Sequence, residues 1–231
     1  MNLTASRQLL IFRIINIAAL IGLLGVLTGS LDLQILVGEQ PCPLCLLQRS
    51  GMIGLAVGPI MNLLWGMRPA HYAVSILAAL TGGAASTRQI LLHIATPGDP
   101  GYGPAVAGFH LYTWAFITFA VGAAGCAVLL LFSSQFTLGD TGVLRRKGPM
   151  RIATLTVVVW TFVYLVIIAV TVLPECGLGM CPDDPASNGS IKTPVGVFGF
   201  LVFVLGSLAL GYLLDRLLPS DEDAPTLAPI P

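Results

Sequence analysis

The amino-acid sequence predicts an all-α membrane protein with six transmembrane helices. Composition is the first indication: of the 231 residues, 55% are hydrophobic and only 10% are charged, whereas soluble domains carry roughly 25% charged residues. The second is a set of six apolar stretches, each long enough for the roughly 20 residues that span a bilayer. The third is a net charge of zero without a basic stripe, which argues against a nucleic-acid partner.

The six apolar stretches define the predicted helices in chain order. They cover residues 10–36, 45–67, 71–94, 109–132, 152–173 and 195–214. Each is apolar along its length rather than at the helical period, as expected where the lipid and the bundle interior are both apolar. The first stretch is too long for a signal peptide and no small-residue cleavage site follows it, so we expect a retained helix.

Positive charge predicts how the helices are oriented. The basic residues that flank the helices fall on one side if both termini share that side. They are Arg7, Arg13, Arg68, Arg145, Arg146, Lys147, Arg151 and Arg216. The connections on the other side hold Lys192 as their one clear cation. Because cytoplasmic loops carry the excess of Lys and Arg, both termini are expected in the cytoplasm.

The same pattern divides the chain into four parts. Residues 1–133 are predicted to form a core of four helices, and residues 134–151 a basic cytoplasmic loop. Residues 152–216 hold two further helices with an outer loop at 174–194. The acidic, proline-rich residues 217–231 have the composition of a disordered cytoplasmic tail.

Four of the five cysteines lie on the outer side of this topology. Cys42 and Cys45 fall in the first connection, Cys176 and Cys181 in the last outer loop, and Cys126 inside the fourth helix. Disulfides persist in oxidising compartments such as the bacterial periplasm, so two pairs are expected there. Four cysteines allow three pairings, of which the shortest loops favour 42–45 and 176–181.

The first pair carries the chemistry that the sequence indicates best. Pro43 suits the first turn of a helix, so Cys42 and Cys45 should straddle a helix N-terminus, whose dipole favours a thiolate. Gln48 and Arg49 follow Cys45 by three and four residues and therefore share its helical face. An ionisable residue one turn inside a membrane helix is usually functional. The alternatives are a structural disulfide and an arginine that extends to the interface.

The string Cys-Pro-Leu-Cys-Leu-Leu-Gln-Arg at residues 42–49 resembles the signature of the disulfide bond formation protein B (DsbB) family. The resemblance extends over four helices, roughly residues 10–133. It implies a bacterial inner-membrane enzyme that reoxidises a periplasmic, thioredoxin-like dithiol oxidase (DsbA-like) and so supports disulfide bond formation and protein folding. The electrons would pass to a membrane quinone, either ubiquinone or menaquinone.

The resemblance also implies roles for individual residues. Arg49 would lie beside the quinone ring, Cys45 would be the sulfur nearest to it, and Cys42 would exchange with the second cysteine pair. Gln48 is expected at the same site. Two polar residues at the outer end of the third helix, Arg88 and His93, correspond to an arginine and a histidine that similar proteins place near the quinone head. The alternative for these two is interfacial anchoring.

The chain departs from the family pattern in the position of the second cysteine pair. The family carries that pair after its third helix, but here residues 95–108 contain no cysteine, and Cys176 and Cys181 follow the fifth predicted helix. The two added helices are therefore expected to carry the missing loop. Which of the two cysteines meets the partner protein stays open, and a small structural disulfide is the alternative for this pair.

Three other functions are compatible with cysteines at a membrane surface. A membrane electron conduit working in the reductive direction would need cysteines within the helices, where this chain has Cys126 alone. A soft-metal transporter would bind Cu or Zn through reduced thiolates, and counting free thiols distinguishes it from an oxidase. A vitamin K epoxide reductase-like enzyme shares the quinone chemistry but carries its Cys-x-x-Cys motif nearer the end of the bundle.

Overall fold

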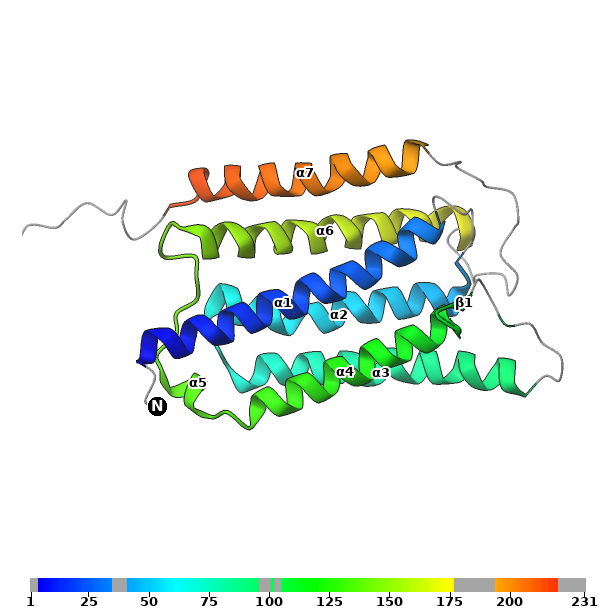
Figure 1. The fold of residues 1–231 in the computed structure, drawn as a ribbon, viewed down its shortest axis with the longest axis horizontal. Coiled ribbons are helices and arrows are strands. Elements are labelled where there is room, and N and C mark those ends of the chain that lie inside the picture. Colours follow the sequence, from blue (N-terminus) through cyan, green and yellow to red (C-terminus); the bar gives the residue numbers. More distant parts are fainter. Residues whose placement is uncertain (1–3, 35–40, 96–100, 102–104, 177–193, 220–231) are drawn as a thin grey trace, which may run out of the picture.

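The computed structural model describes residues 4–34, 41–95, 101, 105–176 and 194–219, without the side chains of residues 170–204. Six long helices run roughly along one axis (Figure 1), in the positions that the apolar stretches predict. They are α1 (Ala5–Asp32), α2 (Pro43–Trp65), α3 (Pro69–Ile94), α4 (Leu111–Leu130), α6 (Pro149–Cys176) and α7 (Pro194–Leu217). A single turn, α5 (Ser134–Thr137), follows α4.

The predicted all-α membrane class is confirmed. Among the described residues, four helices are long and apolar enough to cross a bilayer: α1, α2, α4 and, over Pro149–Ala169, α6. Crossing by α3 and α7 stays a prediction, which their 26 and 24 residues and their places beside the other helices favour (Figure 1).

The helix limits differ from the predicted ones by up to five residues, and two differences concern the loops near the cysteines. The loop before α4 contains a two-stranded antiparallel hairpin, β1 (Ala105–Val106) and β2 (Phe109–His110). Its two-residue turn needs positive φ at both positions, which Ala107 (51°) and Gly108 (83°) provide. The fifth long helix, α6, also begins and ends three residues beyond its predicted limits, so Cys176 is the last residue of a helix rather than part of a loop.

The helices pack around an interior built from both halves of the chain. Buried leucines of α1 and α2 form one apolar cluster with Phe119 of α4 and the α6 residues Val157 and Ile168. Between α2, α3 and α4 the approach is very close, because a Cβ at Gly82 would lie 2.2 Å from the Phe119 ring. Close packing through small residues is the usual way in which membrane helices associate.

The helix α6 forms part of this bundle and does not stand apart from it. It packs against α1 and α2, and α7 covers its outer side (Figure 1). The hydroxyl of Tyr164 on α6 is hydrogen-bonded to that of Thr28 on α1. Between α6 and α7, the buried side chains of Arg151 and Asp215 form an ion pair at 3.2 Å. The C-terminal helices therefore support the C-terminal half of α1, where the candidate site lies.

A buried polar cluster joins the helices at the opposite end of the bundle. The amide of Asn16 donates to the hydroxyl of Tyr72 at 3.1 Å, and Tyr72 donates to Gln135 of α5 at 3.0 Å. In the same region, Arg13 of α1 pairs with Asp140 at 2.5 Å. The connection between α4 and α6 is thus tied to α1 and α3, far from the cysteine pair.

Candidate redox site

The first cysteine pair lies at the N-terminus of α2. Cys42 is the N-cap residue, Pro43 is the first helical residue, and the Cα atoms of Cys42 and Cys45 are 5.0 Å apart in a disulfide. The backbone N–H of Cys45 donates to Sγ of Cys42 at 3.1 Å, in the manner of an N-cap side chain. The disulfide is the one that the short loop favours, and Cys42 is buried.

A glutamine of α3 reaches both sulfur atoms. Nε2 of Gln89 lies 3.2 Å from Sγ of Cys42 and 3.7 Å from Sγ of Cys45. Its side-chain oxygen accepts a hydrogen bond from Nε2 of Gln48 at 2.8 Å. Both glutamines are buried, with exposed fractions of 2% for Gln89 and 5% for Gln48. The packing of α3 against α2 therefore places a fixed amide donor beside the disulfide.

Arg49 lies one helical turn deeper and is held by the C-terminal end of α1. Its Nε donates to Oγ of Ser30 at 2.9 Å, one terminal nitrogen to the Ser30 carbonyl at 3.1 Å and the other to Oε1 of Gln34 at 2.6 Å. Gln34 belongs to a π-helical turn at residues 33–34 that follows α1, a feature that is frequent at functional sites. With an exposed fraction of 6%, the guanidinium is a buried cation with a fixed orientation.

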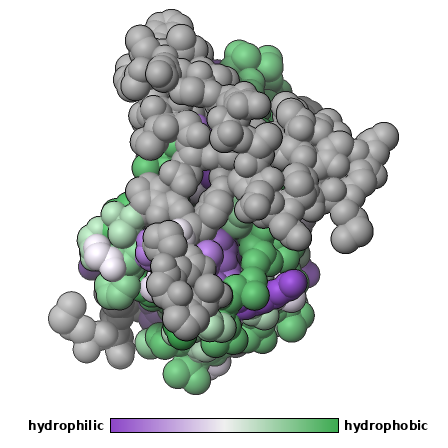
Figure 2. Space-filling model, turned by 90° about the vertical axis from the view of Figure 1, so that its right-hand side faces the viewer, coloured by the Kyte–Doolittle hydropathy of each residue, from purple (hydrophilic) through white to green (hydrophobic). Residues whose placement is uncertain are grey.

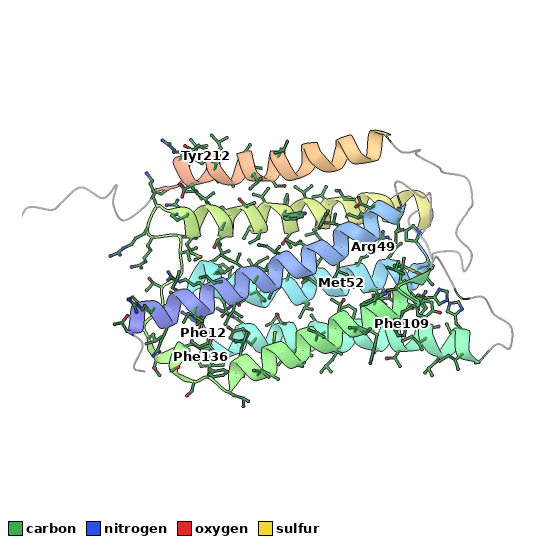
Figure 3. All side chains as sticks on the ribbon, viewed as in Figure 1. Phe12, Arg49, Met52, Phe109, Phe136 and Tyr212 are labelled. Atoms are coloured by element: carbon green, nitrogen blue, oxygen red, sulfur yellow. A yellow bond between two sulfur atoms is a disulfide. The ribbon has the colours of Figure 1, made fainter. Side chains whose placement is uncertain are left out.

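A cavity of about 430 Å³ lies next to these groups, between α1, α2 and α4. Cys45, Gln48, Arg49 and Gln89 belong to its wall, together with Tyr112. Apart from them the wall is mostly apolar; it also includes Val26, Leu33, Met52, Leu111, Trp114 and Ala115. Figure 3 shows Arg49 and Met52 between the ribbons of α1 and α2, toward the end that carries the disulfide. The volume and the few converging polar groups are typical of a small-molecule site.

A second, longer cavity continues from the first toward the middle of the bundle. The two share Val26, Trp114 and Thr118 in their walls. The second has a volume of about 640 Å³, runs between α1 and α4, and ends near Tyr72 and Cys126. Its wall is almost entirely apolar. Together the cavities can hold a compact polar head near the disulfide and an extended apolar chain behind it.

Comparison with known proteins assigns the segment that contains these groups. Residues 12–100 match the family model described as "Disulfide bond formation protein DsbB". This segment is therefore similar to the DsbB family. The sequence resemblance is thereby confirmed for α1 to α3, over a shorter range than the 10–133 expected. The remaining helices, α4, α6 and α7, lie outside the matched residues.

Individual relatives agree with the DsbB assignment. Disulfide bond formation protein B of Aromatoleum aromaticum is 34% identical over 84 residues, which are 35% of this chain and 51% of that protein. The protein of the same name in Pseudomonas syringae pv. tomato is 39% identical over 80 residues, 33% of this chain and 46% of that protein. The chain thus spans about half the length of the curated relatives it matches. No solved structure matches significantly.

The other predicted ligands of the DsbB-family region lie outside the cavity wall. Arg88 of α3 is exposed and lines a separate, shallow depression with Thr87 and Leu91. His93 stacks on the ring of Tyr112, with centroids 5.0 Å apart and planes 14° from parallel. His110 stacks on Tyr112 at 5.3 Å as well. The structure thus separates Arg88 from the sulfurs and places His93 behind a residue that lines the cavity.

The remaining cysteines are described only in part. Cys176 ends α6, at the same end of the bundle as the first pair (Figure 1), but its side chain lies outside the described residues. Cys181 lies outside them entirely. Cys126 is free and buried on α4. Over the described parts of the chain, no three His, Cys, Asp or Glu side chains are grouped so that they could hold a metal.

Three polar residues of the DsbB-family site were not predicted as ligands: Gln89, Ser30 and Gln34. The last two are four residues apart in an apolar stretch, a spacing that places two side chains on one helical face and that could have marked them. Gln89 follows Arg88 directly, and a charged neighbour is the more conspicuous candidate. Seen from the right-hand end of Figure 1, hydrophilic residues form a small patch beside apolar ones (Figure 2).

Proposed function

We propose that this protein is a multi-pass thiol:quinone oxidoreductase of the bacterial inner membrane that reoxidises a thioredoxin-like dithiol protein in the periplasm. The observation that carries the proposal is that a disulfide sulfur, that of Cys45, and the buried cation of Arg49 line one cavity. The similarity to proteins named disulfide bond formation protein B supports it. The activity would keep exported proteins supplied with disulfides.

The cavity suits a membrane quinone in its donor groups and in its shape. A quinone is a flat ring with two carbonyl acceptors and an apolar tail. Arg49 would offer a cationic donor to the ring, and Gln48 and Tyr112 supply further polar groups at the same level. The apolar cavity between α1 and α4 would take the tail. When bound, a quinone supplies the capacity to accept two electrons and two protons.

The cysteines perform thiol–disulfide exchange in this proposal. The partner first reduces the second cysteine pair, Cys176 and Cys181. A thiolate of that reduced pair attacks the Cys42–Cys45 disulfide, and its second thiol then closes the Cys176–Cys181 disulfide again. The partner thereby loses two electrons, and Cys42 and Cys45 become a dithiol. These two residues next give two electrons and two protons to the bound quinone and re-form their disulfide. The cycle balances and leaves the protein unchanged.

Arg49 serves the second half of this cycle. Negative charge develops in the cavity while electrons leave the sulfur, and a cation that is already oriented needs no rearrangement at that moment. Its hydrogen bonds to Ser30 and Gln34 hold the guanidinium in place before any ligand enters. We therefore assign Arg49 to charge stabilisation next to the ring, as the family resemblance implies.

The second cysteine pair is proposed as the link to the partner protein. Helix α6 brings Cys176 to the end of the bundle at which Cys42 lies (Figure 1). A disulfide between Cys176 and Cys181 would accept electrons from the partner and pass them to the first pair by exchange. With both termini in the cytoplasm, as the basic loops predict, both pairs face the periplasm.

The test mixes the purified protein with a reduced thioredoxin-like oxidase and a short-chain ubiquinone, and follows the quinone absorbance. We expect turnover that Cys42→Ser and Cys45→Ser abolish and that Cys126→Ser leaves intact, since Cys126 lies far from the disulfide on α4. Replacing Cys176 or Cys181 with serine should stop transfer from the partner but not from a small dithiol. The proposal fails if the wild-type protein reduces neither ubiquinone nor menaquinone analogues.

A further inference from the structure

The geometry points to Gln89 as an additional catalytic residue of this site: its amide donates a hydrogen bond to whichever sulfur of the Cys42–Cys45 pair carries negative charge. The inference deepens the proposed function and rests on it for its purpose. Gln89 is not among the residues that the family resemblance implies for this site.

The position of one nitrogen atom is the first argument. Nε2 of Gln89 lies 3.2 Å from one sulfur and 3.7 Å from the other. The amide can therefore serve both sulfurs with a small rotation of its side chain and without moving α3. Since Gln89 has an exposed fraction of only 2%, water does not compete for this donor.

The orientation of the amide is the second argument. Gln48 donates to the oxygen of Gln89 at 2.8 Å, which leaves the NH₂ group of Gln89 as the part that faces the sulfurs. A disulfide sulfur has no proton to donate and acts only as a weak acceptor. The side-chain oxygen of Gln89, if turned toward the disulfide, would be repelled by the sulfur lone pairs. The disulfide and Gln48 therefore favour the same orientation of the Gln89 amide, with its NH₂ group toward the sulfurs.

Each sulfur of the pair has a polar donor nearby. Sγ of Cys42 accepts from the Cys45 N–H at 3.1 Å and from Gln89, at a helix N-terminus that favours negative charge. Sγ of Cys45 faces the cavity that Arg49 also lines. When an incoming thiolate attacks one sulfur, the S–S bond breaks and its electron pair leaves on the other sulfur. Either leaving sulfur then has a polar donor within reach.

This arrangement has a consequence for the redox equilibrium. Hydrogen bonds to the thiolate stabilise the reduced pair, and a stabilised reduced form makes a disulfide a stronger oxidant. Gln89 would thus help the pair to take electrons from the partner. The amide also keeps Cys42 as a thiolate, which is the form that attacks when the disulfide closes again.

The decisive variant is Gln89→Leu, which keeps a similar volume and removes the donor. In the reduced protein, the thiolate fraction at a fixed pH below the midpoint should fall about tenfold, as judged by ultraviolet thiolate absorbance during a pH titration. In a glutathione buffer, the equilibrium between dithiol and disulfide should shift about tenfold toward the disulfide, which corresponds to about 30 mV. Neither measurement requires quinone.

Ser86→Ala is the matched control. Ser86 lies on α3 less than one turn from Gln89, is fully buried, and donates to the Gly82 carbonyl at 3.1 Å. This variant removes a buried polar group from the same helix but should leave both the titration and the potential at their wild-type values. Gln48→Leu, which frees the Gln89 amide to turn away, should give a shift in the same direction as Gln89→Leu but smaller.

The outcomes separate this inference from the proposed function. A Gln89→Leu protein that titrates and equilibrates like wild type overturns the role of Gln89, even if quinone turnover is normal. A wild-type protein without quinone reductase activity overturns the proposed function, whatever the titration shows. If Gln89→Leu does not fold, Gln89→Met supplies the same loss of a donor with a more adaptable side chain.

Discussion

Replacing Arg49 with methionine should separate the two halves of the proposed reaction. Methionine keeps an unbranched apolar side chain and removes the charge and the hydrogen bonds to Ser30 and Gln34. Removing one donor that is oriented in advance costs about 10²–10³-fold in rate in comparable sites. We therefore expect kcat for quinone reduction to fall about 100-fold, which corresponds to about 2.7 kcal/mol.

Thiol exchange should respond much less to the same change. The sulfurs have other donors, Gln89 and the Cys45 N–H, whereas the guanidinium of Arg49 donates to Ser30 and Gln34. The rate at which a small dithiol reduces the Cys42–Cys45 disulfide without quinone should stay within about threefold of wild type. Steady-state quinone absorbance measures quinone reduction, and acid trapping of free thiols measures thiol exchange.

Arg88→Met is the control for the loss of one positive charge near the disulfide-bearing end of the bundle. Arg88 is exposed on α3 and outside the cavity wall, so the variant should keep wild-type turnover. A loss of activity in Arg88→Met would instead favour the role that the family resemblance implies for Arg88. Wild-type kcat and KM for quinone in Arg49→Met would refute the reasoning on Arg49, and an equal loss in both halves would point to a structural role.

Two further predictions concern the bundle around the site. Tyr164→Phe removes the hydroxyl that joins α6 to Thr28 of α1, and we expect the free energy of unfolding in detergent to fall by about 1 kcal/mol. The control is Tyr212→Phe on the exposed side of α7, which should lower the free energy of unfolding by less than half of the loss in Tyr164→Phe. Equal losses in the two variants would show that the contact of α6 with α1 does not stabilise the bundle. Gly22→Leu should raise KM for a long-chain quinone about fivefold, since Gly22 lines the cavity between α1 and α4 and a Cβ there would have no other atom within 4 Å. Gly25 has as much free space around it but lies outside the cavity wall, so Gly25→Leu should leave KM unchanged. Gly22→Leu should also leave KM unchanged when the quinone lacks the tail.

Local spacing explains which parts of the site could be predicted. Pro43 after Cys42 identifies a helix start, and the four-residue step from Cys45 to Arg49 places both side chains on one face. Both inferences depend only on helix geometry, and the structure places Cys45 and Arg49 in the cavity wall. The six helices could be predicted for a similar reason, because continuous apolarity over about 20 residues is sufficient to identify a membrane helix.

Contacts between helices could not be predicted in this way. Gln89 lies 44 positions beyond Cys45 in the chain, and nothing in its neighbours indicates that α3 would turn this residue, and not Arg88, toward the disulfide. That choice depends on the rotation of α3 about its axis, which the close contact of Gly82 with Phe119 helps to set. The extension of α6 to Cys176 and the packing of Tyr164 on Thr28 likewise depend on the neighbouring helices.

The sequence alone thus determined the helices, the cysteine pair at a helix start and the arginine one turn below, because each depends on residues a few positions apart. The tertiary structure decided which side chains complete the site, where the cavity lies, and that α6 supports α1 from outside the DsbB-family segment. Those features arise where separate helices meet, and in lipid the meeting is set by the fit of small and large side chains rather than by apolarity, which every helix shares.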